Sequence, residues 1–161
     1  MSNGVIYYNI GTKCLTRLAV SIHSLKKHYN GPIAILSDGD ESHQYCHKIA
    51  KSLGCTYVEI TDLPVPPSQY EIYIKKTLYH LYSPYHVNVV LDSDTIVKGS
   101  IDKLFEWADK HEFVACQFAD WRSNSEEGIF RINNWKYIYP ERIQKAIDFG
   151  PFLNAGVHAF R

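Results

Sequence analysis

The chain has 161 residues, a length that fits one domain with a substantial buried core. Lysine and arginine together number 17, and so do aspartate and glutamate, so the formal charge is zero. This balance argues against a protein that binds nucleic acid through a basic surface. No apolar run approaches the roughly 20 residues of a membrane-spanning helix, and no signal-peptide pattern is visible. The four cysteines form no C-x-x-C pair, so we expect free thiols in a cytoplasmic protein.

The N-terminal third of the chain alternates between short apolar runs and amphipathic segments. The β-branched and aromatic runs predict strands, and apolar residues three or four apart predict helices. The expected elements are strands at 5–10, 33–36 and 56–60 and helices at 14–28 and 42–53. Ser42 is the expected cap of the second helix, and Tyr45 is expected on its core face.

The same alternation continues to the end of the chain. The expected elements are a helix at 70–81 with Leu81 on its core face, a strand at 86–91, a helix capped by Ser100, a strand at 113–118, a short helix opened by Pro140 and a strand at 154–160. Apolar strands that alternate with helices predict an α/β fold. We therefore expect residues 1–161 to form a single domain, with a mostly parallel twisted sheet and helices on both faces.

The strongest chemical signal is the sequence Asp92-Ser93-Asp94 directly after the apolar strand at 86–91. In an extended segment, side chains two residues apart point the same way, so both carboxylates can face one site. Two hard oxygen ligands suit Mg²⁺ or Mn²⁺, and open α/β sheets bind ligands at the carboxyl ends of their strands. The pattern therefore indicates a metal site that Asp92 and Asp94 share.

Two other segments bear on a bound nucleotide. Gly11-Thr12 follows the first strand but lacks the G-x-G-x-x-G pattern of dinucleotide-binding folds, and no G-x-x-x-x-G-K-[ST] phosphate loop occurs. The kinase, ATPase and dehydrogenase classes therefore have no motif support. Lys75 and Lys76 precede Asp92 by about sixteen residues, and one of them could neutralise a diphosphate bound at the metal.

Taken in order, these segments resemble the nucleotide-sugar glycosyltransferases of the GT-A fold. Within that class, they resemble the family-8, glycogenin-like group and its bacterial and viral relatives. The resemblance rests on the strand at 5–10, the runs 73–78 and 83–85, the segment 89–97 around Asp-x-Asp, and the Asn-small-Gly pattern at 152–157. It spans nearly the whole chain, and it implies a Rossmann-like GT-A domain.

The resemblance also implies roles for individual residues. Asp92 and Asp94 would bind the metal, with Asp94 the more direct ligand, and Asp120 would contact sugar or acceptor as a third catalytic residue. The nucleotide would be bound by Asn9, Ile10, Gly11, Thr12, Asp38, Lys75, Lys76 and Ser93, and the donor sugar would face Asn154, Ala155 and Gly156. Between the two lysines, Lys76 is favoured as the nucleotide contact because Thr77 follows it, as in the relatives.

The expected function is transfer of a hexose from a UDP-sugar to a hydroxyl of a glycan, a glycoprotein or another acceptor, with Mn²⁺ or Mg²⁺ as cofactor. Family-8 enzymes usually carry a further His-x-x-Gly-x-x-Lys segment, which these 161 residues lack. The chain is therefore expected to be the N-terminal portion of a longer protein or a compact variant. Two alternatives stay open: a non-catalytic sugar-nucleotide or carbohydrate-binding module, and a sugar-phosphate nucleotidyltransferase, whose Gly-rich N-terminal loop is missing.

Overall fold

The computed structural model describes residues 2–61, 63, 75–76, 78–120, 145, 148 and 151–161. Most of the predicted helix at 70–81 and the short helix after Pro140 lie outside these residues. The chain divides into two compact units, Met1–Val114 with Gly156–Arg161, and Ala115–Ala155. The elements are β1 (Asn3–Ile10), α1 (Leu15–Leu25), β2 (Ile33–Asp38), α2 (Asp40–Leu53), β3 (Thr56–Ile60), the 3₁₀ helix η1 (Tyr79–Tyr82), β4 (Val87–Leu91), α4 (Asp102–His111), β5 (Phe113–Asp120) and β6 (Pro151–Phe160).

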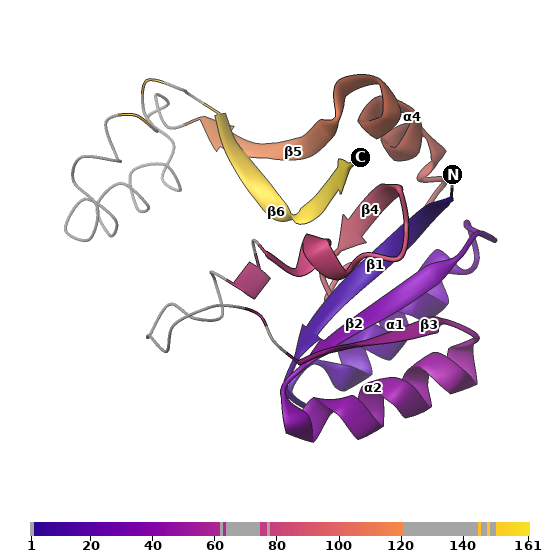
Figure 1. Cartoon of the computed structure of the whole chain (residues 1–161). Coiled ribbons are helices and arrows are strands. Elements are labelled where there is room, and N and C mark those ends of the chain that lie inside the picture. The colour runs from indigo at the N-terminus through magenta and orange to yellow at the C-terminus, as the bar shows by residue number, and fades with distance from the viewer. Residues whose placement is uncertain are drawn as a thin grey trace. The chain divides into compact units, whose positions relative to one another are not determined.

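Six strands form one sheet in the order β3-β2-β1-β4-β6-β5 (Figure 1). The strands β3, β2, β1 and β4 are parallel to one another, and β6 runs antiparallel to β4. The predicted α/β fold with a mostly parallel sheet is therefore confirmed. In the sheet, β2 and β3 follow one another on one side of β1, and β4 lies on the other side of β1. The strand order thus reverses between β1 and β4, which is where such sheets bind ligands.

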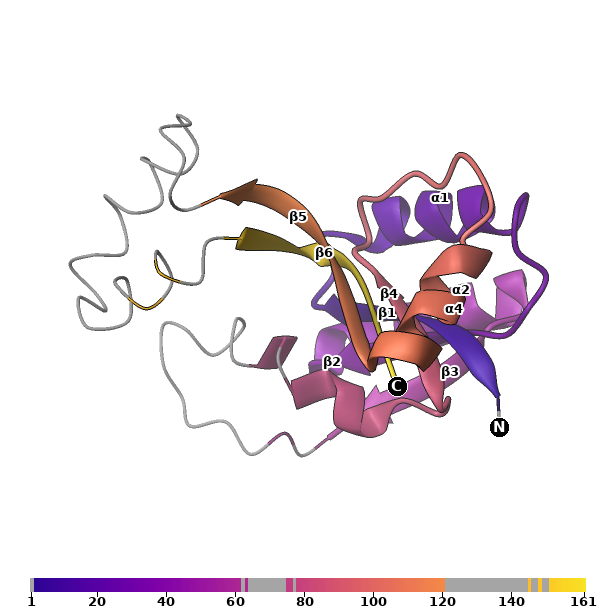
Figure 2. The ribbon, with the colours of Figure 1, turned by 90° about the horizontal axis from the view of Figure 1, so that it is seen from above.

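The core lies on both faces of this sheet because β1, β2 and β4 are mostly apolar and are buried along nearly their whole length. One cluster gathers residues of α1, α2 and α4 against the strand residues that include Tyr7 and Ile35 (Figure 2). A second cluster lies on the opposite face, where Tyr79 of η1 packs on strand residues that include Tyr8 and Leu36. Neighbouring residues of one strand therefore pack in different clusters, because successive side chains of a strand point to opposite faces of the sheet.

The start of α2 differs from the prediction. Gly39 has a φ of 92°, a conformation that favours glycine, and the helix begins at Asp40. Ser42 therefore lies inside the first turn instead of capping it, and its buried hydroxyl donates a hydrogen bond of 2.9 Å to the carbonyl oxygen of Asp38. The prediction for Tyr45 is also wrong: its side chain is 44% exposed, because the buried stripe of α2 passes one residue later in the turn.

Other boundaries shift by a few residues. Strand β5 continues through Asp120, and β6 begins at Pro151, so both are longer than predicted. Helix α4 begins at Asp102, whose backbone N–H donates to the hydroxyl of Ser100. The chain is 3₁₀-helical at Tyr79–Tyr82, and this tighter winding leaves Leu81 65% exposed, against the prediction that it faces the core.

The hydroxyl of Tyr7 is fully buried in the first cluster, 3.0 Å from the hydroxyl of Ser21. Burial is the main cause that raises the pKa of Tyr7 to about 12, from an ordinary value of 10.0. Because the folded pKa is the higher one, the neutral phenol contributes its full stability below pH 10. That contribution is lost as the pH rises toward 12, by about 1.4 kcal/mol for each pH unit.

We therefore expect the free energy of unfolding to fall less steeply between pH 10 and 12 in Tyr7→Phe than in the wild type. Urea titrations across this range measure the two slopes. Other tyrosines contribute to both slopes equally, so the difference reports Tyr7 alone. Equal slopes would mean that Tyr7 ionises no later in the folded chain than in the unfolded one.

Candidate functional site

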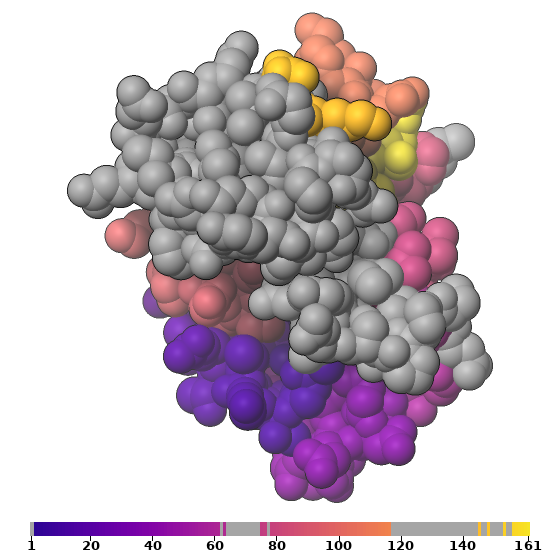
Figure 3. All heavy atoms as spheres, turned by 90° about the vertical axis from the view of Figure 1, so that its left-hand side faces the viewer, coloured from indigo at the N-terminus to yellow at the C-terminus, as the bar shows by residue number. Residues whose placement is uncertain are grey.

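A cavity of about 230 Å³ lies at the carboxyl ends of β1 and β4, where the strand order reverses. Strand β1 runs from the N-terminus toward the left-hand side of Figure 1, the side that faces the viewer in Figure 3. The described residues that line the cavity are Tyr8, Asn9, Ile10, Cys14, Lys76, Asp92, Ser93 and Asp94. Three segments that are distant in sequence, at 8–14, 76 and 92–94, thus converge on one small cavity.

The segment that carries the two aspartates is held by backbone and side-chain hydrogen bonds. The N–H of Asp92 donates to the carbonyl oxygen of Gly156 in β6 at 2.8 Å. The hydroxyl of Thr95 donates to the carbonyl oxygen of Asp92 at 2.9 Å and lies 2.9 Å from the hydroxyl of Ser21 in α1. These contacts fix the turn between Asp92 and Thr95, so the carboxylates at its start project from a rigid base.

Asp92 and Asp94 supply the oxygen ligands that Mg²⁺ and Mn²⁺ prefer, and both side chains line the cavity. Within the described residues, no group of three His, Cys, Asp or Glu side chains is placed to hold a metal ion. The two carboxylates fit a cation that keeps several water ligands or takes phosphate oxygens in their place. Such a cation would use Asp92 and Asp94 as its protein ligands.

The two adjacent lysines pair with different carboxylates. The ammonium of Lys76 lies 3.4 Å from Oδ1 of Asp92, and both side chains are partly exposed at the cavity. The ammonium of Lys75 lies 3.2 Å from Oδ2 of Asp38, and this pair is largely buried, with side chains 19% and 9% exposed. Of the two lysines, Lys76 lines the cavity together with Asp92 and Asp94, and Lys75 does not.

The inner wall of the cavity is formed by Asn9 and Tyr8. Asn9 is buried, and its amide nitrogen donates to the carbonyl oxygen of Gly11 at 2.8 Å and to the thiol of Cys46 at 3.4 Å. The amide oxygen Oδ1 of Asn9 is also buried, and none of the described residues donates a hydrogen bond to it. A buried acceptor of this kind is costly unless a donor reaches it, and Asn9 is one of the residues that line the cavity.

Aromatic stacking supports the same wall. The rings of Tyr8 and Tyr79 lie parallel with their centroids 4.7 Å apart. Burial, and then the nearby charge of Asp92, raises the pKa of Tyr79 well above its usual range, so its hydroxyl stays neutral. That hydroxyl lies 3.2 Å from Nε2 of His158 in β6. The ring of Tyr8 in β1 is thus covered by Tyr79 of η1, which follows the segment that carries the two lysines.

The predicted site residues divide into three groups. The structure brings Asn9, Ile10, Lys76, Asp92, Ser93 and Asp94 together around the cavity. Five others are not among the described residues that line the cavity: Gly11, Thr12, Asp38, Lys75 and Gly156. Gly11 and Thr12 follow the lining residue Ile10 in the chain. Asp38 and Gly156 accept hydrogen bonds from lining residues, and Lys75 pairs with Asp38. Asp120, Asn154 and Ala155 lie in β5 and β6, in the second compact unit, and their side chains are outside the described residues.

Three contributors to the site were not predicted. Tyr8 and Cys14 line the cavity, and Tyr79 stacks on Tyr8. Tyr8 immediately precedes Asn9 at the end of a buried strand, a position that could have drawn attention to it. Cys14 and Tyr79 carry no such signal, because only the packing of the sheet shows which side they face.

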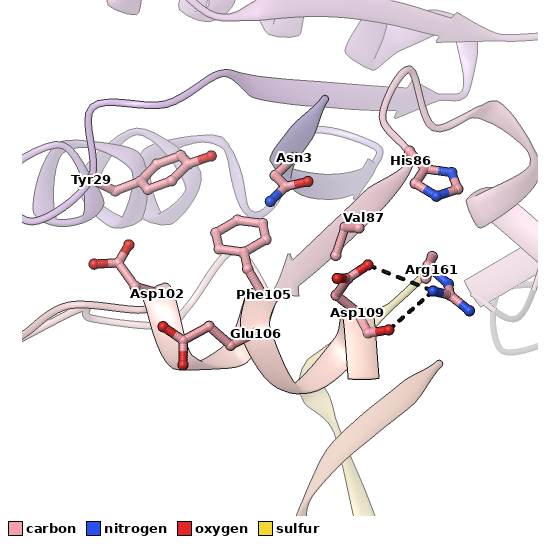
Figure 4. Close-up of a pocket in the computed structure, with 9 residues that line it drawn as sticks. All are labelled: Asn3, Tyr29, His86, Val87, Asp102, Phe105, Glu106, Asp109 and Arg161. Atoms are coloured by element: carbon pink, nitrogen blue, oxygen red, sulfur yellow. Dashed lines mark hydrogen bonds and ion pairs between the residues drawn. The ribbon is translucent and has the colours of Figure 1, made fainter. Parts of the chain in front are cut away.

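A second cavity, of about 730 Å³, lies at the opposite ends of the same two strands, where Asn3 begins β1 and Val87 begins β4 (Figure 4). Its wall includes three carboxylates of α4, and one of these, Asp109, pairs with Arg161 at 3.6 Å. Its aromatic wall is formed by Phe105 and by Tyr29, which is stacked on it. This cavity is separate from the one that Asp92 and Asp94 line, and its residues provide control positions for experiments.

The chain is similar to known proteins in sequence and in fold. No protein-family model matches the chain. Galactinol synthase 7 of Arabidopsis thaliana is 29% identical to it over 162 aligned residues, which cover 92% of the chain. Among solved structures, a galactosyltransferase, LgtC, in complex with donor and acceptor sugar analogues, superposes with a TM-score of 0.62 at 15% identity over 98% of the chain. The chain has the GT-A glycosyltransferase fold.

A second GT-A structure agrees with this assignment. Glucosyl-3-phosphoglycerate synthase of Mycobacterium tuberculosis, crystallised with Mn²⁺, UDP and glucosyl-3-phosphoglycerate, superposes with a TM-score of 0.53 at 15% identity over 99% of the chain. The resemblance seen in the sequence is thus confirmed by similarity to these proteins. The chain spans 47% of the length of galactinol synthase 7, 57% of LgtC and 56% of the synthase.

No helix in the described part of the chain is both long enough and apolar enough to cross a bilayer.

Proposed function

We propose that this chain carries the donor site of a glycosyltransferase that moves a hexose from a UDP-sugar to an acceptor hydroxyl. The observation that carries the proposal is the cavity at the reversal between β1 and β4, which joins Asp92 and Asp94 to Lys76. The GT-A fold and the similarity to galactinol synthase 7 support it. The chain would share this chemistry with LgtC, whose structure contains donor and acceptor sugar analogues.

The cavity has one end suited to a nucleobase and another suited to a diphosphate. The Oδ1 of Asn9, to which no described residue donates, can accept a hydrogen bond from an imide N–H, a group that uracil has and cytosine lacks. The ammonium of Lys76 and the carboxylates of Asp92 and Asp94 form the charged end. We therefore assign the uridine to the Asn9 side and the diphosphate to the Lys76 side.

When bound by Asp92 and Asp94, Mn²⁺ or Mg²⁺ would neutralise the charge that develops on the departing diphosphate. Lys76 would donate hydrogen bonds to the same phosphates, which stabilises the leaving group. The rigid turn at Thr95 would hold the carboxylates in place, so little reorganisation accompanies the reaction. Asp120, Asn154 and Ala155 remain proposals for the donor-sugar and acceptor side.

The acceptor would be a hydroxyl of a glycan, a glycoprotein or a smaller molecule, and the four cysteines, all free thiols, suit a protein of the cytoplasm. The non-catalytic binding module remains the second candidate, because the chain spans only about half of its relatives. The two candidates share the donor cavity, so they differ in turnover and not in nucleotide affinity.

The identity of the base is tested by thermal shift. We expect UDP with Mn²⁺ to raise the melting temperature by several degrees at saturating concentration, since ligand binding to the folded state alone stabilises it. GDP, ADP and CMP should raise it less, and Asn9→Leu should remove the preference for UDP. A larger shift with GDP than with UDP would overturn the assignment of the base. Release of UDP from UDP-glucose then separates an enzyme from a binding module.

A further inference from the structure

We propose that Lys75 is a positioning residue for the nucleotide site: it holds Asp38 and Tyr8 in a buried network that fixes the wall of the donor cavity. The inference rests on the proposed function and deepens it, since it gives the two adjacent lysines different tasks. Lys76 would contact the diphosphate directly. Lys75 would act through Tyr8, without touching the nucleotide.

The network centres on the carboxylate of Asp38, at the carboxyl end of β2. Its Oδ2 accepts a hydrogen bond of 2.8 Å from the hydroxyl of Tyr8 and lies 3.2 Å from the ammonium of Lys75. Its Oδ1 accepts from the same ammonium at 3.4 Å. Because the side chain of Asp38 is only 9% exposed, its charge depends on hydrogen-bond partners such as these instead of on water.

The helical backbone of residues 75 and 76 explains why their ammonium groups separate. Successive residues of a helix point about 100° apart, so adjacent side chains cannot serve the same target. Lys75 reaches inward to β2, and Lys76 reaches Asp92 at the end of β4. Their side-chain exposures of 19% and 44% follow this division. Only Lys76 is therefore accessible to a ligand in the cavity.

Tyr8 connects the network to the cavity. Its hydroxyl donates to Asp38, and its ring stacks on Tyr79, three residues after Lys76. The same residue lines the cavity beside Asn9. Removal of the Lys75 ammonium would leave Asp38 buried with Tyr8 as its remaining partner in the network, and the carboxylate would move toward water to recover hydration. Tyr8 would follow its acceptor, and the wall next to the nucleobase would loosen.

This division of tasks has a direct test in the affinities for uridine and for UDP, measured by calorimetry with Mn²⁺ present. For Lys76→Met we expect UDP to bind about tenfold more weakly or worse, and uridine to bind as in the wild type, because one charge-assisted phosphate contact is lost. For Lys75→Met we expect uridine and UDP to weaken by the same factor. Lys75→Arg, which keeps the cation, should restore most of both affinities.

A loss that Lys75→Met confines to UDP would overturn the inference, because it would make Lys75 a direct phosphate ligand. Unchanged affinities for both ligands would overturn it as well, even if the melting temperature fell. Failure of Lys75→Arg to recover any affinity would show that the ion pair is not what matters at this position.

The network itself is tested without any ligand by a thermal double-mutant cycle. Lys75→Met should lower the melting temperature less in the Asp38→Asn background than in the wild type, because the pair is then already broken. Equal effects in the two backgrounds would overturn the network. If the wild-type chain bound neither UDP nor uridine, the proposed function would fall, and with it the role of Lys75 at that site, while the cycle would still report on the ion pair.

Discussion

Asp94→Asn is expected to lower the Mn²⁺-stimulated release of UDP from UDP-glucose by about 100-fold or more, since a metal at a leaving phosphate supplies several kcal/mol of stabilisation. The asparagine keeps the shape of the side chain but removes its charge, so it binds a divalent cation weakly. Asp94 is exposed and lines the cavity at the carboxyl ends of β1 and β4, and the change should leave the melting temperature nearly unaltered. Loss of release with an unchanged fold would assign the carboxylate to the site.

The control for this change is Asp109→Asn. Asp109 is also an exposed carboxylate, 67% exposed, but it lines the second cavity at the opposite ends of β1 and β4. Its substitution should leave the release of UDP unchanged. Binding of Mn²⁺ followed by electron paramagnetic resonance, in the presence of UDP, separates metal affinity from turnover. Full activity in Asp94→Asn would refute the metal site, and an equal loss in both variants would point to a general effect of charge.

The carboxylate pair could be predicted from the sequence because its position depends on local features. A run of apolar residues predicts a buried strand, and polar residues directly after it must lie at the carboxyl end of a parallel sheet. The structure places Asp92 and Asp94 there, at the reversal between β1 and β4. Their binding of a metal stays a prediction that the substitutions above test.

The wall of the cavity could not be predicted in the same way. Asp38 and Lys75 are 37 residues apart, and Tyr8 and Asp38 are 30 apart, so their meeting depends on the packing of β1 and β2. No spacing rule connects such residues. Spacing alone could not separate Lys75 from Lys76, since the sequence places both at almost the same distance from Asp92, and only the resemblance favoured Lys76.

The errors at Ser42 and Tyr45 have separate physical origins. A serine before an apolar stripe favours a helix cap, but the positive φ of Gly39 allows the helix to begin two residues earlier. A tyrosine is partly polar and can lie at the edge of a helix stripe with its ring exposed. Cys46, which the pattern did not select, takes the buried position and contacts Asn9 instead. Asn9, which lines the cavity, is thus held in part by a core residue of α2.

The largest effect on stability is expected on α1, where the buried and exposed faces can be compared within two residues. Leu18 is fully buried against the sheet, and Val20 is 51% exposed. Leu18→Ala should lower the free energy of unfolding by about 3 kcal/mol, because it removes apolar contacts and leaves a cavity that the sheet cannot fill. Val20→Ala should change it by about 0.5 kcal/mol or less, since it is a surface position and alanine favours a helix.

Urea denaturation of both variants measures this difference. Helix α1 follows β1 directly and carries Ser21, whose hydroxyl contacts Thr95 beneath the aspartate turn. Leu18→Ala should therefore also weaken the binding of UDP with Mn²⁺ if the turn depends on the position of α1. Val20→Ala is the control for stability alone, because Val20 lines a small cavity together with Asp94. Equal losses of stability in the two variants would show that the sheet does not bury the Leu18 face of α1.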